Sequence, residues 1–341
     1  MRKRYFADVV SCTGAVIGAG FASGREVIAF FTRYGVHGWW LIVLSSGTMA
    51  FLCALSLQCA SKRTDKAGWY TLFGPAARLC TLLLMLLTGG AMLSAAGHMI
   101  EMVWANNQAY FIGMLGTLTA AWTLSFGSLR PLGWLSGMLT SVLLATIIEL
   151  LFQSTPAEMA LLIPSGNLWQ AAICSIAYAS MNMTLALGVV CRCAQLDARE
   201  NAKIAAGFGC LMAALLGCAQ LLYMRNPQLL DEPFPIVKLL SGLGRKGFLL
   251  SAVLLYLSVF TTLISIIFAV KEAMNRLFDK PVAAVFTLGL PLAVSFVGFT
   301  SIVDRLYAPA GLLCLALVFV PPFLQRLDKI RINALPSKIA E

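Results

Sequence analysis

Glycine is concentrated in one stretch of the first apolar segment, where it could expose backbone groups to a bound molecule. The run from Thr13 to Glu26 holds four glycines, at 14, 18, 20 and 24, together with a serine. Each glycine weakens a helix by about 1 kcal/mol relative to alanine, so the run predicts local unwinding. Unwinding leaves bare amides that suit an anionic group and bare carbonyls that suit a cation. The run therefore predicts a binding site for a small solute and an ion.

The same glycines allow a second interpretation, which is helix packing. Gly14-x-x-x-Gly18 and Gly20-x-x-x-Gly24 have the small-residue spacing that lets membrane helices approach closely. A nucleotide-binding role is excluded, because no strand precedes the run and no βαβ unit surrounds it. Binding and packing both remain open at this point.

Charged residues adjoin the glycine run and favour a cavity there. Arg25 and Glu26 fall within an apolar segment, and charges so placed usually face a cavity or a partner. Arg25 is expected near the outer end of the first segment and Asp304 near the outer end of the last. The two could pair across an outer vestibule and act as a gate. The alternative is an arginine that extends to lipid headgroups.

Composition places these residues in a helical membrane protein. Of 341 residues, 59% are apolar and 12% are charged, and the mean hydropathy is +0.83. A soluble domain of this length cannot hide so much apolar surface, whereas a bilayer can solvate it. Apolar runs such as 82–87 and 249–257 are continuous rather than alternating, which excludes barrel strands. We expect an all-α polytopic membrane protein, a single transmembrane domain over 1–341, with the lipid bilayer as its partner.

Ten apolar segments are long enough to cross a bilayer. They cover approximately 6–33, 36–60, 76–104, 109–127, 133–154, 168–190, 203–223, 247–270, 281–299 and 303–325. With both termini inside, 18 of the 25 Lys and Arg residues lie on the cytoplasmic side and 7 outside, as the positive-inside rule requires. The prediction is an inner-membrane protein with a cytoplasmic N-terminus, retained rather than cleaved as a signal peptide, and a short cytoplasmic tail over 326–341.

The connections and the remaining composition add few further expectations. The stretch 61–74 is expected to lie in the inner interface as an amphipathic segment, and 225–246 is expected to contain a short helix over an outer vestibule. The net charge of +10 is dispersed over short loops, so no nucleic-acid partner is expected. None of the ten cysteines has the paired spacing of a metal site, and Cys191-Arg-Cys193 is taken as packing.

The glycine run also carries a family resemblance. Residues Gly18 to Glu26, followed by Phe30-Phe31 and Tyr34-Gly35, resemble the N-terminal signature of the YkvI-type bacterial membrane proteins, a branch of the amino acid–polyamine–organocation superfamily. The resemblance implies the LeuT fold. Segments one to five (about 6–154) and six to ten (about 168–325) would then form two inverted repeats. The first and sixth helices would both be broken at the substrate site.

The resemblance also implies site residues. The amides of Ala19 and Gly20 would meet an anionic group of the substrate, and the whole substrate-binding set would be Gly18, Ala19, Gly20, Phe21, Ser23, Asn182 and Thr184. A sodium ion would lie between the carbonyls of Gly14 and Ile17 and the group formed by Ser258, Thr261 and Thr262. The alternative for these threonines is hydroxyls that bond back to the preceding turn of their own helix.

Two departures from the family pattern narrow these expectations. The sixth segment has a polar patch over 180–188 but only one glycine, so Asn182 and Thr184 could instead bond between helices. Phe21 stands where some relatives have an asparagine that binds another sodium ion. We therefore expect at most one sodium ion and no other cofactor.

The favoured function is a cation-coupled symporter of a small solute, such as an amino acid or a related organic ion, that works by alternating access. The alternative is a membrane receptor or partner subunit of the same fold, which binds a small solute without moving it. An enzyme is not expected. The sequence holds no HExxH, no Gly-x-Ser-x-Gly and no paired-carboxylate motif for diphosphate substrates.

Overall fold

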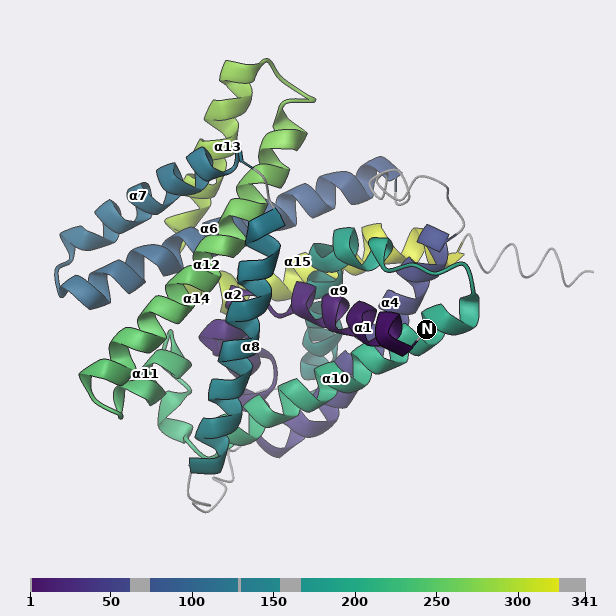
Figure 1. Ribbon diagram of the computed structural model, residues 1–341, viewed down its shortest axis with the longest axis horizontal. Helices are drawn as coiled ribbons and strands as arrows, with labels where there is room; N and C mark the ends of the chain where they lie inside the picture. The colour runs from purple at the N-terminus through teal and green to yellow at the C-terminus, as the bar shows by residue number, and fades with distance from the viewer. Residues whose placement is uncertain (1, 62–73, 128–129, 154–166, 325–341) are drawn as a thin grey trace, which may run out of the picture.

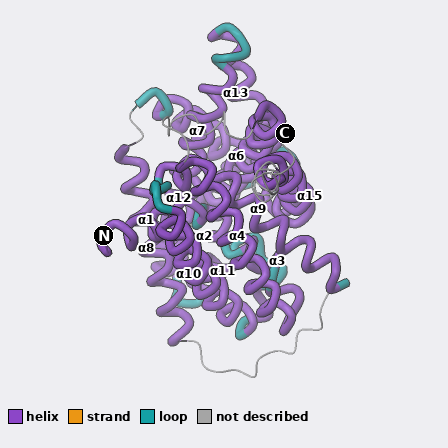
Figure 2. Tube along the Cα trace, turned by 90° about the vertical axis from the view of Figure 1, so that its right-hand side faces the viewer, coloured by secondary structure: helices purple, strands orange, loops and turns teal. Residues whose placement is uncertain are grey.

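The computed structural model describes residues 2–61, 74–127, 130–153 and 167–324, and within them the chain is helical, with no strand (Figures 1 and 2). The N-terminal half contains α1 Arg2–Val16, α2 Ala19–Ser23, α3 Arg25–Phe30, η1 Thr32–His37, α4 Gly38–Ser61, α6 Gly74–Trp104, α7 Gln108–Leu124 and α8 Arg130–Gln153. The C-terminal half contains α9 Leu168–Arg192, α10 Ala198–Met224, η2 Pro227–Leu229, α11 Pro235–Ser241, α12 Arg245–Met274, α13 Lys280–Ser295, α14 Phe299–Ser301, η3 Ile302–Leu306, α15 Tyr307–Cys314 and η4 Leu315–Phe319.

The predicted class, a helical membrane protein, is confirmed. Every predicted apolar segment contains helix, and six helical stretches among the described residues are long and apolar enough to cross a membrane. The short helix expected within 225–246 is α11. The expected amphipathic segment at 61–74 lies almost entirely outside the described residues, as do the tail at 326–341 and the last residue of each predicted repeat.

The long helices form two groups, each of which draws on both halves of the chain (Figure 1). In the first group α1 and α4 pack on α9 and α10. In the second group α6 packs on α7, α12 and α13. The helix α15 lies against both α9 and α6, and α8 contacts α10 and α12. The space between the two groups is where the interrupted first segment meets α12.

The first apolar segment is not one helix. α1 ends at Val16, Gly18 is extended (φ −104°, ψ −164°), and α2 begins at Ala19. The Gly18 amide donates to the Val16 carbonyl (2.9 Å). A second turn follows at Gly24, whose φ of +82° lies in the left-handed region that favours glycine. α3 then begins at Arg25, so the segment has an interruption and a turn within eight residues.

The predicted break of the sixth helix is wrong, because α9 is continuous from Leu168 to Arg192. Its polar residues do not disturb the backbone. The Asn182 side chain donates to the Tyr178 carbonyl (3.0 Å), and the Thr184 hydroxyl donates to the Ser180 carbonyl (2.8 Å), each one turn earlier. A stretch with a single glycine and polar groups satisfied within the helix has no physical reason to unwind.

Glycine sets the closest approach between α9 and α15. A methyl group on Gly311 would lie 2.1 Å from the Ala177 carbonyl oxygen, a contact with backbone that cannot move aside. The Ser180 hydroxyl donates to the Gly311 carbonyl across the same contact. Small residues are the usual means by which membrane helices come this close.

This contact generates a stability prediction. Gly311→Ala should force α15 away from α9 and lower stability by about 1–3 kcal/mol, the usual cost of overpacking. The matched control is Gly116→Ala, on an exposed face of α7 with no atom within 4 Å of the added methyl group. Thermal unfolding of the purified protein in detergent measures both changes. Equal melting temperatures for the two variants would contradict the packing described here.

Candidate functional site

A cavity of about 740 Å³ lies beside the interruption between α1 and α2. Its lining residues come from α1, α2 and α3, and from α6, α8, α9, α10, α12 and α15. The volume is within the range of small-molecule sites, roughly 300–1,000 Å³. Since both helix groups contribute, any relative movement of the groups would change the shape of the cavity.

Most of the predicted solute-binding residues line this cavity. Gly18, Ala19, Gly20 and Phe21 do so at the interruption, and Asn182 does so from α9. The Asn182 amide nitrogen is bonded to its own helix. Its Oδ1 makes no hydrogen bond to the described part of the chain and is available to a ligand as an acceptor.

Ser23 and Thr184 do not line the cavity. The Ser23 hydroxyl donates to the Gly20 carbonyl (2.7 Å) and accepts from the Arg25 amide (3.1 Å), so it joins α2 to α3. Thr184 is fully buried within α9, with its hydroxyl on the Ser180 carbonyl. The structure therefore gives both residues a role in holding backbone.

Four of the five residues predicted to bind sodium line the cavity, namely Gly14, Ile17, Thr261 and Thr262. In a continuous helix the Gly18 amide would donate to the Gly14 carbonyl. It donates to the Val16 carbonyl instead, so the Gly14 carbonyl does not accept that helical hydrogen bond. The Thr262 hydroxyl lies 4.0 Å from the position of a Cβ atom on Gly18. The end of α1 and the middle of α12 thus present oxygen atoms to the same space.

Ser258, the fifth residue, does not line the cavity. Its carbonyl accepts the hydroxyls of Thr261 (3.0 Å) and Thr262 (2.9 Å), the back-bonded arrangement typical of threonine in helices. A donating hydroxyl keeps its lone pairs, so both threonines can still offer oxygen to a cation in the cavity. Backbone carbonyls and hydroxyls of this kind fit a sodium ion.

The cavity lining also includes seven polar residues that were not among the predicted site residues: Ser11, Thr13, Glu26, Thr88, Ser141, Ser265 and Tyr307. The signal for Glu26 was present in the sequence, because a carboxyl group within an apolar segment marks a functional site by default. Thr88 and Tyr307 gave no signal, since a lone hydroxyl in an apolar helix is common. Only the packing of α6 and α15 around the interruption brings them to it.

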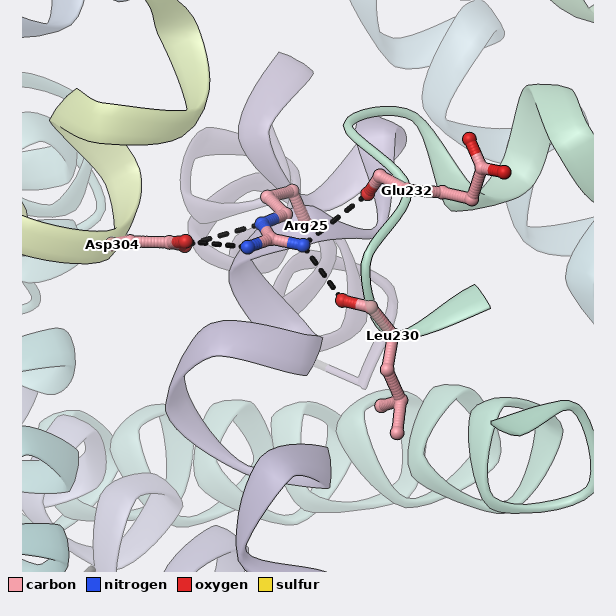
Figure 3. Close-up of polar contacts among 4 residues, drawn as sticks. All are labelled: Arg25, Leu230, Glu232 and Asp304. Carbon is pink, nitrogen blue, oxygen red and sulfur yellow. Dashed lines mark hydrogen bonds and ion pairs between the residues drawn. The ribbon is translucent and has the colours of Figure 1, made fainter. Parts of the chain in front are cut away.

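Arg25 closes one end of the interrupted segment (Figure 3). Its guanidinium forms a two-pronged ion pair with Asp304, in which Nε donates to Oδ1 at 3.1 Å. Its Nη1 donates to the carbonyls of Leu230 (2.7 Å) and Glu232 (3.3 Å). Arg25 is 9% exposed, so it is held between η3 and the segment that leads to α11 rather than extended to headgroups.

The segment around α11 covers the same end. α11 packs on α2, and Phe234 stacks on Phe299 with ring centroids 5.2 Å apart. No described residue of 225–241 lines the cavity. In contrast, exposed lining residues lie at Val10 and Ser11 in α1, Ser141 in α8, Val189 near the end of α9 and Ser265 in α12. The cavity is therefore open toward the start of α1 and closed toward Arg25.

No model of a protein family matches this sequence. The uncharacterized membrane protein YkvI of Bacillus subtilis (strain 168) is 22% identical over 325 residues, covering 89% of this chain and 91% of YkvI. The resemblance to YkvI-type proteins is thereby confirmed.

Among solved structures, the inward-facing conformation of Mhp1 matches with a TM-score of 0.60 and 13% identity, covering 91% of this chain and 76% of Mhp1. Mhp1, a nucleobase-cation-symport-1 family transporter, also matches in a closed conformation with bromovinylhydantoin bound, with a TM-score of 0.56, 12% identity, and 90% and 75% coverage. At such identities the likeness establishes the LeuT fold and nothing about the solute.

The Arg25 contacts generate a second prediction. Asp304→Asn keeps the shape of the side chain but removes the charge that Arg25 meets, and should lower stability by about 1–3 kcal/mol, as for hydrogen bonds to charged groups. The control is Glu200→Gln, which removes the acidic partner of the exposed Lys203 and should leave the melting temperature unchanged. Melting temperatures in detergent report both. An unaltered melting temperature for Asp304→Asn would show that the ion pair does not close this end.

Proposed function

We propose that this protein is a secondary transporter, a cation-coupled symporter that carries a small solute across the membrane by alternating access. The observation that supports it best is the one-sided cavity. A solute-sized space lies at an interrupted helix, open toward the start of α1 and closed at Arg25. A site that opens to one side at a time is what alternating access requires.

The proposed topology has ten spans in two inverted repeats, residues 6–154 and 168–325, with both termini in the cytoplasm. The two helix groups support it. α1 and α4 of the first half pack with α9 and α10 of the second, and α6 and α7 are matched by α12 and α13. Corresponding helices of two repeats are expected to meet in this way. Under this orientation the cavity opens to the cytoplasm.

In the proposed transport cycle the outer end and the inner end of the cavity close in turn. In the present state Arg25 and Asp304 form the outer gate, and the likeness to Mhp1 is greater for the inward-facing conformation than for the closed one. Separation of Arg25 from Asp304 would open the outer end. Closure of α1 against α9 and α12 would then seal the inner end.

The proposed contacts follow the cavity lining. The solute would lie against Gly18, Ala19, Gly20 and Phe21, with Asn182 facing it from α9. One sodium ion would lie between the carbonyls of Gly14 and Ile17 and the hydroxyls of Thr261 and Thr262, and would join α1 to α12. Binding of the ion at a joint between the two groups gives it a direct effect on their relative position.

Sodium coupling is testable in proteoliposomes. Uptake of solute should rise when an inward sodium gradient is imposed, and Thr261→Ala should raise the sodium concentration for half-maximal uptake at least about tenfold, as loss of metal-site groups does elsewhere. Thr119→Ala is the control, because the Thr119 hydroxyl is likewise back-bonded, to the Leu115 carbonyl (3.0 Å), but on an exposed face of α7.

Two results would decide against parts of this proposal. Uptake by Thr261→Ala with unchanged sodium dependence would contradict the proposed sodium site. Binding of a labelled solute with no counterflow would contradict transport and favour a receptor of the same fold.

A further inference from the structure

Glu26 is the one acidic or basic residue among the described residues that line the cavity. No described Lys, Arg or His nitrogen lies within 4.0 Å of its carboxyl group, and the adjacent Arg25 pairs with Asp304 instead. A buried carboxylate without a counter-charge is costly, so such groups normally have a partner. The protein itself supplies none that the structure describes.

The carboxyl group of Glu26 is fixed against the interruption of the first segment. Glu26 is 6% exposed, and a methyl group on Gly20 would lie 1.7 Å from its Oε1. Glycine at position 20 is thus what leaves room for the carboxyl group. This position puts the carboxyl group beside the solute-sized space.

Further acceptor groups in the same cavity lack partners. The hydroxyls of Thr88 and Tyr307 are buried, at 5% and 1% exposure, and neither makes a hydrogen bond to the described part of the chain. Asn182 adds its free Oδ1. Buried polar groups are normally satisfied, and unsatisfied ones that line a cavity point to a ligand. An ammonium group has three donors and no acceptor, which matches a carboxylate surrounded by acceptors.

The geometry points to a solute that carries a protonated amine, with the ammonium group bound by Glu26 and the hydroxyls of Tyr307 and Thr88. The inference rests on the proposed transport function, whose solute class it names. A metal ion is a poorer match to this end of the cavity. Phe21, Met92 and Met181 share the lining and suit the carbon skeleton of an organic molecule rather than the coordination shell of an ion.

The test uses the purified full chain in detergent, with matched probes. Primary alkylamines of graded length, leucine, and alkyl carboxylates of the same carbon numbers are screened by thermal shift and titrated by calorimetry, in sodium chloride and separately in potassium chloride. Amine-bearing probes should raise the melting temperature, because a ligand of the native state stabilises it by mass action. The carboxylates, which lack the amine, should not.

Glu26→Gln should weaken amine binding at least about tenfold, because it removes one member of a buried charge pair. Glu101→Gln, which alters a carboxyl group outside the cavity that pairs with His98, should bind amines as the parent does. If Glu26→Gln fails to fold, Gly20→Ala examines the same contact. Its added methyl group displaces the carboxyl group but keeps the charge, and it should also weaken amine binding.

Three results would overturn the inference: amines that bind Glu26→Gln as well as the parent, a panel in which carboxylates stabilise the protein and amines do not, or no response to any amine. Stabilisation by sodium chloride that depends on Glu26 and is not displaced by amines would also overturn it, in favour of a metal ion.

Counterflow of the labelled solute separates this inference from the proposed function. Amines that bind through Glu26 but show no counterflow would leave the inference intact and end the transport proposal. Counterflow of an anionic solute without an amine would support the transport proposal and overturn this inference.

Discussion

A helix within a bilayer satisfies its own amide and carbonyl groups, and any interruption must be compensated by protein or by a ligand. In this chain the interruption lies in the first apolar segment. Between Val16 and Ala19 the backbone is not helical. The surrounding helices place side-chain oxygen atoms beside this stretch and leave a cavity next to it. The arrangement of α12, α6 and α15 around this point is what makes the interruption tolerable. It also explains why the cavity lies beside this interruption, with the continuous α9 as one of its walls.

Two adjacent charged residues, Arg25 and Glu26, follow the interruption and make different contacts. Arg25 leaves the turn at Gly24 toward Asp304 and the carbonyls that precede α11, whereas Glu26 lies against Gly20 and lines the cavity. Arg25 joins the backbone of distant segments, and Glu26 places a carboxyl group at the wall of the cavity. A movement of α3 that separates Arg25 from Asp304 would also move Glu26, because Arg25 and Glu26 both belong to the first turn of α3. In the proposed transport cycle, closure of the outer end and recognition of the solute would therefore be linked through α3.

The first and sixth segments are unequal in a way that composition explains. Four glycines and Ser23 accompany the interruption and turn in the first, while the sixth keeps a continuous helix whose polar side chains bond one turn back. A continuous α9 offers side chains such as Asn182 to the cavity but no free amides or carbonyls. Of these two segments, the first brings backbone groups outside the regular helical hydrogen bonds to the cavity, and the sixth brings side chains.

The sequence by itself determined the helical membrane class, the positions of the apolar segments, the short helix within 225–246, and the place where the first segment is interrupted. Each of these depends on local composition, through hydropathy or the low helix propensity of glycine. The sequence also indicated that Arg25 and Asp304 could meet. Tertiary structure alone decided that Ser23 and Thr184 hold backbone rather than line the cavity, and that Thr88 and Tyr307 line it together with Glu26. The physical reason is that these outcomes depend on which face of each helix is turned inward. Helix packing across distant parts of the chain fixes that choice, and almost uniformly apolar segments carry little periodic signal from which to infer it.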